Sequence, residues 1–156
     1  MCSGISIARC EIPESLIDRY RLSNQIIRRG KDADDEFRFL LAERFPVLPV
    51  WHEGQFQIFA WGNRDRHTGL PISGWCRRES LEAGEWSPLQ PREVFIPASF
   101  GWDRGVWYQI REGIKGVLVC ESGGSPHVFV LTQPATHYYQ VMTRNHREPV
   151  FTGEQI

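Results

Sequence analysis

The sequence predicts an α+β fold in which N-terminal helices precede a mainly antiparallel, barrel-like sheet. Two observations favour this class: apolar residues recur at helical spacing over the first 45 residues, and β-rich segments separated by turn residues follow them. A third is that strands and helices do not alternate along the chain, which argues against a parallel sheet built from βαβ units. The 156 residues suit a single compact domain, residues 1–156, without a linker or an internal repeat.

Two helices are expected before the first strand. One covers residues 13–30, because Pro13 suits a first helical position and apolar residues recur at helical spacing from Leu16 to Ile26. The other covers residues 34–45, where phenylalanine and leucine side chains would share one face.

Strands and turns dominate the rest of the chain. Gln55 to Trp61 alternates polar and apolar residues, as a half-buried strand does. A hairpin turn is expected over residues 122–126, because two adjacent glycines adopt positive φ easily. A loop is expected over residues 62–74 and a short helix over residues 78–84. The predicted strands cover residues 47–51, 55–61, 93–97, 106–111, 116–120 and 128–132.

The composition argues against several functional classes. The formal net charge is −1, so the strong basic excess of many nucleic-acid-binding proteins is missing, although a local basic face is compatible with it. No apolar run approaches the roughly 20 residues that span a bilayer, and no signal peptide is recognisable at the N-terminus. We therefore expect a cytoplasmic protein without a membrane partner.

Motifs for nucleotide or metal chemistry are absent. The sequence contains no G-x-x-x-x-G-K-[ST], G-x-G-x-x-G, H-E-x-x-H or G-x-S-x-G motif, and its five histidines lack metal-ligand spacing. Its four cysteines are scattered, without a C-x-x-C pair. We expect no cofactor, no metal and four reduced thiols.

Cys2 is the first candidate for chemistry. Removal of Met1 would give Cys2 a free α-amine beside its thiol, and both groups have ordinary pKa values of about 8 to 8.5. Such a 1,2-aminothiol condenses with an aldehyde to a five-membered thiazolidine, and an abasic site in DNA exposes an aldehyde. The alternative is a buried cysteine whose position is accidental.

Five further segments follow Cys2 in a recognisable order. They are FPV at 45–47, AWG at 60–62, CRRESL at 76–81, FIPAS at 95–99 and NHREPV at 145–150. In order and spacing they resemble the signature blocks of the SOS-response-associated peptidase (SRAP) family, whose members typically begin M-C-G-R. The family blocks are W-G-L-x-P, N-A-R-x-E-T, I-P-A-x-G-F-Y-E-W and H-x-R-M-P, and the resemblance covers Cys2 and residues 45–151.

The resemblance implies both a fold and an activity. The family fold is a compact α+β domain with a cleft that leads to the N-terminal cysteine. The implied activity is the covalent capture of abasic sites in single-stranded DNA, as a thiazolidine DNA–protein cross-link made in response to DNA damage. Self-removal of Met1, the peptidase or hydrolase activity of the family name, would precede it. The implied partner is single-stranded DNA, and we expect a monomer.

The resemblance also assigns roles to residues. Cys2 matches the nucleophile, and Arg77 matches the arginine that binds a DNA phosphate. Trp75 stands where the family has an asparagine, which puts the normal positioning of the cysteine amine in doubt. Asp103 stands where the family has its catalytic glutamate, and it keeps a carboxylate on a shorter side chain. The alternative for Asp103 is an ordinary turn residue.

The last block departs further from the family. Asn145 stands at the position of the catalytic histidine, and His146 follows one residue later. On a strand His146 would face the opposite side, whereas in a loop or bulge it could replace the missing histidine. The alternative is a solvated His146. Arg147 keeps the family register, and Glu148 adds a negative charge that opposes phosphate binding.

Further residues are candidates for DNA binding. An exposed Trp61 could stack on a base, and its alternative is core packing. A basic patch around Cys2 could be formed by Arg77, Arg78, Arg104, Arg144 and Arg147, and the alternative is a solvated, salt-bridged surface.

Four hypotheses about function remain open at this point. The first is a SRAP-type autopeptidase and abasic-site cross-linker that acts through Cys2, Asp103 and His146. The second is a catalytically degenerate relative that binds DNA or another partner without covalent chemistry. A cysteine hydrolase acting on another substrate, and a small structural protein of a phage or mobile element, rank below these two.

Overall fold

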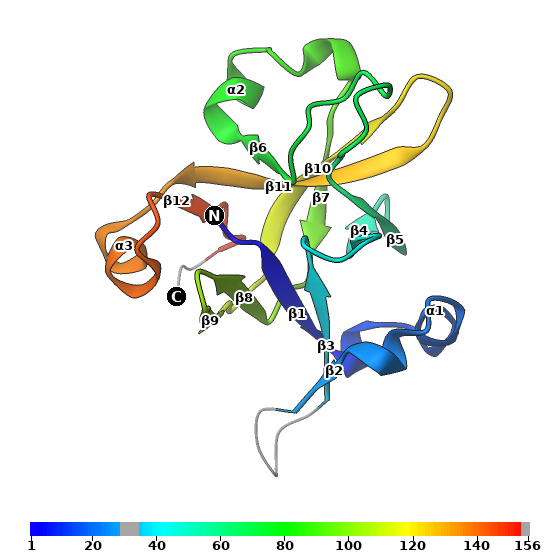
Figure 1. Cartoon of the computed structure of the whole chain (residues 1–156), viewed down its shortest axis with the longest axis vertical. Coiled ribbons are helices and arrows are strands. Elements are labelled where there is room, and N and C mark those ends of the chain that lie inside the picture. The colour runs from blue at the N-terminus through cyan, green and yellow to red at the C-terminus, as the bar shows by residue number, and fades with distance from the viewer. Residues whose placement is uncertain (29–34, 154–156) are drawn as a thin grey trace.

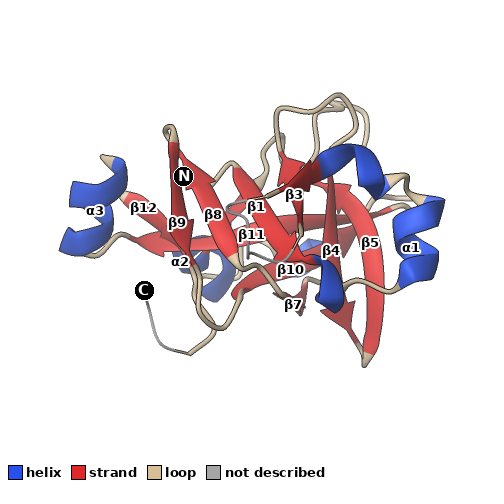
Figure 2. Cartoon of the chain, turned by 90° about the horizontal axis from the view of Figure 1, so that it is seen from below, coloured by secondary structure: helices blue, strands red, loops and turns tan. Residues whose placement is uncertain are grey.

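The computed structural model describes residues 1–28 and 35–153. Two sheets make up most of it, and short helices lie around their edges (Figures 1 and 2). The helices are α1 (Glu14–Arg19), α2 (Arg78–Glu82) and α3 (His137–Thr143), and short 3₁₀ helices cover Arg9–Glu11, Leu22–Gln25 and Ser87–Leu89. The strands are β1 (Gly4–Ala8), β2 (Ile26–Ile27), β3 (Glu36–Leu40), β4 (Val47–His52), β5 (Gln55–Trp61), β6 (Trp75–Arg77), β7 (Arg92–Ile96), β8 (Phe100–Asp103), β9 (Val106–Gln109), β10 (Ile114–Cys120), β11 (Pro126–Pro134) and β12 (Arg147–Pro149).

The larger sheet closes into a barrel. Its strand order is β10-β7-β4-β5-β11, and an additional pairing of β10 with β11 closes the ring of five strands. Most of the pairs are antiparallel, but β11 runs parallel to β5 and to β6. Closure removes the free sheet edges that would otherwise invite pairing with another chain. This confirms an α+β fold with a mainly antiparallel, barrel-like sheet.

The smaller sheet carries the N-terminal segment. Its order is β2-β3-β1-β8-β9, with β1 in the centre and every pair antiparallel. The spacing of buried residues fits a strand, in which every second side chain faces the same side. Ile5 and Ile7 of β1 are both buried, as are Phe37 and Phe39 of β3. Buried side chains of both sheets belong to one hydrophobic cluster, so the two sheets share a core.

Most strands predicted from the sequence are confirmed. The segments predicted at 47–51, 55–61 and 93–97 correspond to β4, β5 and β7, and those at 106–111, 116–120 and 128–132 correspond to β9, β10 and β11. The helix predicted at 78–84 is α2, and residues 62–74 form the predicted loop. The turn before β11 contains Gly123 and Gly124, both at positive φ.

The prediction of a helix over residues 34–45 is wrong. Residues 36–40 form β3 instead, which pairs with both β1 and β2. Phe37 and Leu40 fit helical spacing, but Phe37 and Phe39 also fit the period of a strand. Residues 36–40 adopt the strand conformation because β1 and β2 pair with their backbone on either side. Residue 34 lies outside the described part of the chain.

The helix predicted over residues 13–30 is much shorter in the structure. Helix α1 covers Glu14–Arg19 only, and Arg21 adopts a left-handed conformation with φ 54° that ends it. A 3₁₀ turn over Leu22–Gln25 and the short strand β2 follow. Residues 29 and 30 lie outside the described part.

The sequence did not predict helix α3 or the strands β1, β2, β6, β8 and β12. Among the described residues, no helix is long and apolar enough to cross a membrane.

Candidate functional site

Backbone pairing from two strands fixes the N-terminal segment. The Ser3 N–H donates to the Trp102 carbonyl at 2.9 Å, and the Leu41 N–H donates to the Ser3 carbonyl at 2.9 Å. The segment before β1 therefore continues between the ends of β3 and β8. As a result Cys2 lies at the end of the central strand and has an exposed fraction of 0%.

Polar groups surround the Cys2 thiol. Its Sγ–H donates to the Gly4 carbonyl oxygen at 3.1 Å, and the Tyr108 hydroxyl is a donor to the sulfur. Burial raises the pKa of the Cys2 thiol, and the hydrogen bond from Tyr108 partly offsets this rise. The indole N–H of Trp75 donates to the Cys2 carbonyl oxygen at 2.7 Å. Trp75 thus holds the Cys2 backbone from the barrel side.

Asp103 forms the centre of a buried polar cluster. Its carboxylate is 1% exposed and lies 3.4 Å from the α-amine of Met1. The Tyr139 hydroxyl donates to Oδ2 at 2.7 Å, and the Asn145 side-chain amide donates to Oδ1 at 3.2 Å. The carboxylate therefore has three partners, which come from the N-terminus, from α3 and from the segment before β12.

Asn145 takes its orientation from neighbouring backbone groups. The Asn145 N–H donates to the Thr143 hydroxyl at 3.2 Å, and the Arg147 N–H donates to the Asn145 Oδ1 at 3.4 Å. With Oδ1 used as an acceptor, the amide nitrogen faces Asp103. The residue that occupies the family's histidine position thus reaches the carboxylate, and His146 does not share this contact.

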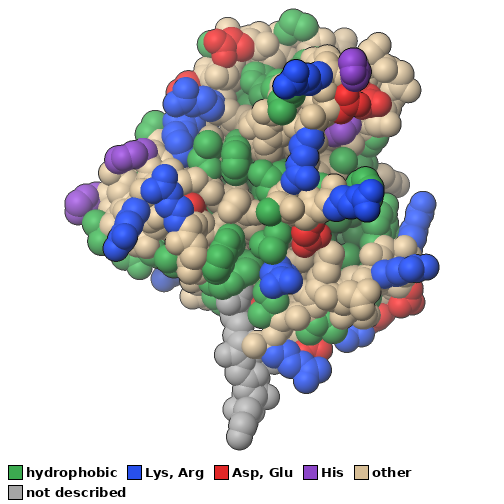
Figure 3. Space-filling model, in the orientation of Figure 1, with side chains coloured by type: hydrophobic (Ala, Val, Ile, Leu, Met, Phe, Trp, Pro, Cys, Tyr) green, Lys and Arg blue, Asp and Glu red, His purple; other side chains and the backbone are tan. Residues whose placement is uncertain are grey.

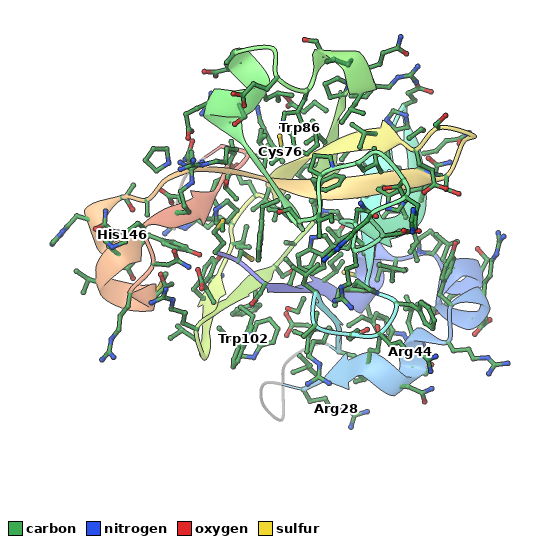
Figure 4. All side chains as sticks on the ribbon, turned by 45° about the horizontal axis from the view of Figure 1, so that its top comes forward. Arg28, Arg44, Cys76, Trp86, Trp102 and His146 are labelled. Atoms are coloured by element: carbon green, nitrogen blue, oxygen red, sulfur yellow. The ribbon has the colours of Figure 1, made fainter. Side chains whose placement is uncertain are left out.

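His146 is an exposed residue just before β12. Figure 4 shows it at the end of the molecule that carries α3. Its backbone carbonyl accepts a hydrogen bond from the Ala135 N–H at 2.9 Å. The solvated alternative from the sequence therefore describes its position, and His146 is not part of the cluster around Asp103.

Tyr108 and Tyr139 link Cys2 to Asp103. Their hydroxyls lie 3.3 Å apart, and their rings meet edge to face with centroids 5.2 Å apart. Tyr108 lies opposite Gly101 in the β8–β9 pair. A Cβ at Gly101 would come within 2.4 Å of the Tyr108 ring and hydroxyl, so the missing side chain leaves room for Tyr108.

The Arg147 guanidinium is bonded to other groups of the protein. Its side chain is 13% exposed and lies 2.7 Å from the Glu79 carboxylate. It also donates to the carbonyl and the hydroxyl of the buried Thr132, at 3.0 and 3.2 Å. These bonds anchor β12 to α2 and β11, and they occupy much of the guanidinium that the resemblance would offer to a phosphate.

Arg77 and Arg78 lie nearer to solvent. Arg77 is 64% exposed and approaches Glu79 only at 4.0 Å. Arg78 pairs with Glu82 at 3.2 Å and donates to Gln133 at 2.9 Å. On the face seen in Figure 3, Lys and Arg side chains lie beside a stretch of hydrophobic side chains, with acidic side chains among them.

Trp61 belongs to the core. It is 2% exposed, and its indole N–H donates to the Gly74 carbonyl at 3.0 Å. The core-packing alternative therefore describes Trp61, and its buried ring is not available to stack on a base.

An open cavity adjoins the N-terminal segment. It has a volume of about 390 Å³, and its wall includes Ser3, Leu41, Arg64, Ile72 and Trp75. Ser3 follows Cys2 in the chain, and the Trp75 indole donates to the Cys2 carbonyl oxygen. This cavity therefore lies next to the segment that carries the thiol.

The four cysteines are free, and Cys2 and Cys76 are buried. Burial raises the pKa of the Cys76 thiol to about 12. Cys76 and Trp86 belong to one hydrophobic cluster against which Leu81 of α2 packs, and Figure 4 shows the two side chains close together. Within residues 1–28 and 35–153, no group of three or more His, Cys, Asp or Glu side chains is arranged to hold a metal ion.

Sequence reasoning identified Cys2 and Asp103 but missed Tyr108 and Tyr139. Tyr139 lies in a helix that was not predicted, and Tyr108 stands in none of the motif blocks. The one signal in the sequence was Gly101, because a glycine on a strand leaves room for a bulky side chain on the paired strand.

Comparison with known proteins gives no match: no family model, no curated protein and no solved structure matches this chain.

Proposed function

We propose that this chain is a divergent SRAP-like protein that captures abasic sites in single-stranded DNA through Cys2, after Met1 has been removed. The observation that carries the proposal is the ion pair between the Met1 amine and the buried Asp103, beside the Cys2 thiol. Cys2, Asp103 and Asn145 are far apart in the sequence, and each occupies a position with a catalytic role in the family blocks. Asn145 donates to Asp103, and Asp103 pairs with the amine of the residue next to Cys2, as a shared site requires.

The Met1–Cys2 peptide bond is within reach of the neighbouring thiol. Attack of the Cys2 sulfur on the Met1 carbonyl carbon passes through a five-membered ring and moves the acyl group from nitrogen to sulfur. Water then hydrolyses the thioester, which releases methionine and leaves a free Cys2 amine. Asp103, which holds the Met1 amine, restrains the bond that has to break.

Capture of the aldehyde then needs both groups of Cys2. The amine adds to the aldehyde carbon and water leaves, which gives an imine. The thiol sulfur next adds to the imine carbon, and the proton lost by sulfur ends on the nitrogen. A carboxylate beside the amine serves as acid and base for these transfers, which typically contributes 10²–10⁴-fold in rate.

A second function is favoured by a different observation. Trp75 holds the Cys2 carbonyl where the family has an asparagine, and Arg147 is bonded to Glu79 and Thr132. A noncovalent binder of single-stranded DNA would need neither an accessible thiol nor a free Arg147. The exposed Arg77 would then contribute most to phosphate binding.

A denaturing-gel assay tests the first function. Protein with Met1 removal confirmed by mass spectrometry is mixed with single-stranded DNA that carries one abasic site. We expect a heat-stable shifted band that is lost in Cys2→Ala and kept in Cys10→Ala, since Cys10 is an exposed cysteine outside the site. Mature protein that gives no band excludes capture, and a filter-binding measurement with the same DNA then tests the noncovalent function.

A further inference from the structure

The cavity beside the N-terminal segment has walls that hold one another in place. The Asn63 N–H donates to the Ser73 carbonyl at 2.9 Å, which ties the two ends of the loop over residues 62–74 together. The Arg64 guanidinium donates to the carbonyls of Leu41 and Glu43, which ties this loop to the segment after β3. The volume of about 390 Å³ lies at the low end of the range of ligand pockets, about 300–1,000 Å³, and suits one ring system.

Trp75 connects this cavity to Cys2. Its indole N–H donates to the Cys2 carbonyl oxygen at 2.7 Å, and its half-buried ring forms part of the cavity wall. The Trp75 backbone N–H donates to the Ser73 hydroxyl at 3.0 Å, and β6, which begins at Trp75, pairs with β11. The ring is therefore fixed, with its N–H edge on Cys2 and another part of its surface on the cavity.

The chemistry of the wall suits a flat, uncharged ring that is attached to an anion. Ile72 is 59% exposed and supplies apolar surface, and Trp75 supplies aromatic surface. Among the described residues that line this cavity, Arg64 is the only charged one. A second cavity shares Arg64 but includes Asp65 and Glu121, whose charges oppose phosphate binding.

We propose that the cavity beside Trp75 binds the nucleobase that neighbours the captured abasic site, with the base stacked on Trp75 and its phosphate beside Arg64. This inference rests on the proposed function and names the part of the DNA that the site recognises. A strand joined to Cys2 begins next to this wall, because the Trp75 indole lies against the Cys2 carbonyl. Every base has a π-face, so stacking on an aromatic ring accepts any of the four bases.

Arg64 has donors left for a phosphate. A guanidinium has five N–H donors, and the bonds to the Leu41 and Glu43 carbonyls use two of them. The Arg64 side chain is exposed. Arg147, in contrast, lies 2.7 Å from the Glu79 carboxylate, which neutralises its charge. Arg64 is therefore better suited than Arg147 to contact the strand.

Binding of DNA without an aldehyde tests the site separately from capture. The probes are single-stranded oligonucleotides with a tetrahydrofuran residue at the lesion position, which does not react with Cys2. In one probe both neighbours of the lesion are adenine nucleotides. In two others the 5′ or the 3′ neighbour is a second tetrahydrofuran, which removes one base and keeps its phosphate. Fluorescence anisotropy gives the Kd of each probe for the mature protein.

We expect the loss of the base that enters the cavity to raise the wild-type Kd by at least about 5-fold. In Trp75→Leu the same loss should raise the Kd by less than about 2-fold, because the stacking partner is gone. Ile72→Ala shortens the opposite apolar side chain and should also reduce the effect. The matched control is Trp51→Leu, a tryptophan on β4 that lines a different cavity, and it should keep the full effect.

Arg64→Gln tests the phosphate contact, because glutamine keeps an N–H donor for the carbonyl bonds and removes the charge. It should weaken binding of all three probes alike, since each retains its phosphates. Unchanged Kd values in Arg64→Gln would overturn this contact.

Two results would overturn the base site. One is a wild-type Kd that changes by less than about 2-fold when either neighbouring base is removed. The other is a full base effect in both Trp75→Leu and Ile72→Ala. If Trp75→Leu does not fold, Ile72→Ala decides alone, because Ile72 is an exposed loop residue.

Failure of the base site and failure of the proposed function give different results. A base effect that disappears in Trp75→Leu, in mature protein that never captures an abasic aldehyde, would support the base site and reject capture. Efficient covalent capture with no base effect would support the capture function and reject the base site.

Discussion

Two polar regions of this protein both contain residues of the family-like blocks, and they differ in what their charges contact. The N-terminal cluster joins Cys2, Asp103, Tyr108, Tyr139 and Asn145 around a carboxylate that is 1% exposed. The arginine cluster, defined by Arg77, Glu79 and Arg147, lies on the surface where α2, β11 and β12 meet. The first region draws on the N-terminus, the β8–β9 hairpin, α3 and the segment before β12, whereas β6, α2 and β12 supply the second.

The difference separates chemistry from binding. Buried polar groups are retained only where each has partners, so the N-terminal cluster keeps its side chains in one arrangement. The arginine cluster has solvent on one side, and Glu79 neutralises part of its charge. We expect substitutions in the first region to affect stability and reactivity together, and those in the second to affect mainly DNA binding.

Asp103→Ala should have the largest effect on stability. It leaves the Tyr139 hydroxyl and the Asn145 amide without their acceptor, and each unsatisfied buried group costs about 1–3 kcal/mol. We expect the free energy of unfolding in urea to fall by about 3 kcal/mol. The control Asp18→Ala, an exposed carboxylate on α1, should change it by less than about 0.5 kcal/mol. Equal losses in both variants would show that the cluster around Asp103 adds no stability.

Gly101→Ala should come next. The new Cβ would lie 2.4 Å from the Tyr108 ring, so the ring has to move away from Cys2. Overpacking of this kind costs about 1–3 kcal/mol in unfolding free energy. In the double variant with Tyr108→Ala the clash disappears, so the two losses should not add. Simple additivity would contradict the close approach of Gly101 and Tyr108.

Arg147→Ala should destabilise more than Arg77→Ala. Arg147 is largely buried and bonds to Thr132, whereas Arg77 is 64% exposed. We expect the free energy of unfolding, measured by thermal denaturation, to fall by about 1–2 kcal/mol for Arg147→Ala. For Arg77→Ala it should fall by less than about 0.5 kcal/mol. The reverse order would mean that Arg77 is the structural arginine.

DNA binding should rank the same two residues in the opposite order. A phosphate contact contributes about one unit to the slope of log affinity against log salt. Arg77→Ala should therefore lower the slope for single-stranded DNA by about 1, and Arg147→Ala by clearly less because Glu79 already neutralises it. Fluorescence anisotropy at several salt concentrations measures both, with Arg92→Ala on β7 as a distant control. Equal slopes in all variants would exclude Arg77 from the interface.

The smallest effect concerns the pKa of Glu79. The hydrogen bond from Arg147 lowers this pKa, and the charge of Arg77 contributes least. A lowered pKa in the folded state gives stability above the unfolded value of about 4.3, and that contribution is lost as the pH falls through the folded value. Arg147→Ala should raise the Glu79 pKa in a carboxyl NMR titration, and Arg77→Ala should change it less. An unchanged value in Arg147→Ala would disprove the pairing in solution.

Local patterns predicted much of the barrel. Gln55 to Trp61 alternates in hydrophobicity, and Gly123-Gly124 marks the hairpin turn, so these elements could be found without tertiary information. Residues 36–40 could not, because Phe37 and Leu40 fit a helix as well as a strand. Pairing with β1 and β2 decides between the two, and that pairing depends on segments distant in the sequence.

The sequence alone determined an α+β class, the strands β4, β5, β7, β9, β10 and β11, and Cys2 and Asp103 as the residues to examine. Only the tertiary structure decided that Asn145 rather than His146 contacts Asp103, that Trp61 is buried, and that Tyr108 and Tyr139 join Cys2 to Asp103. The physical reason is the range of the interactions. Hydrophobic period and turn chemistry act between near neighbours, whereas the hydrogen bonds of the buried Asp103 carboxylate join it to groups that are 36, 42 and 102 residues away in the chain.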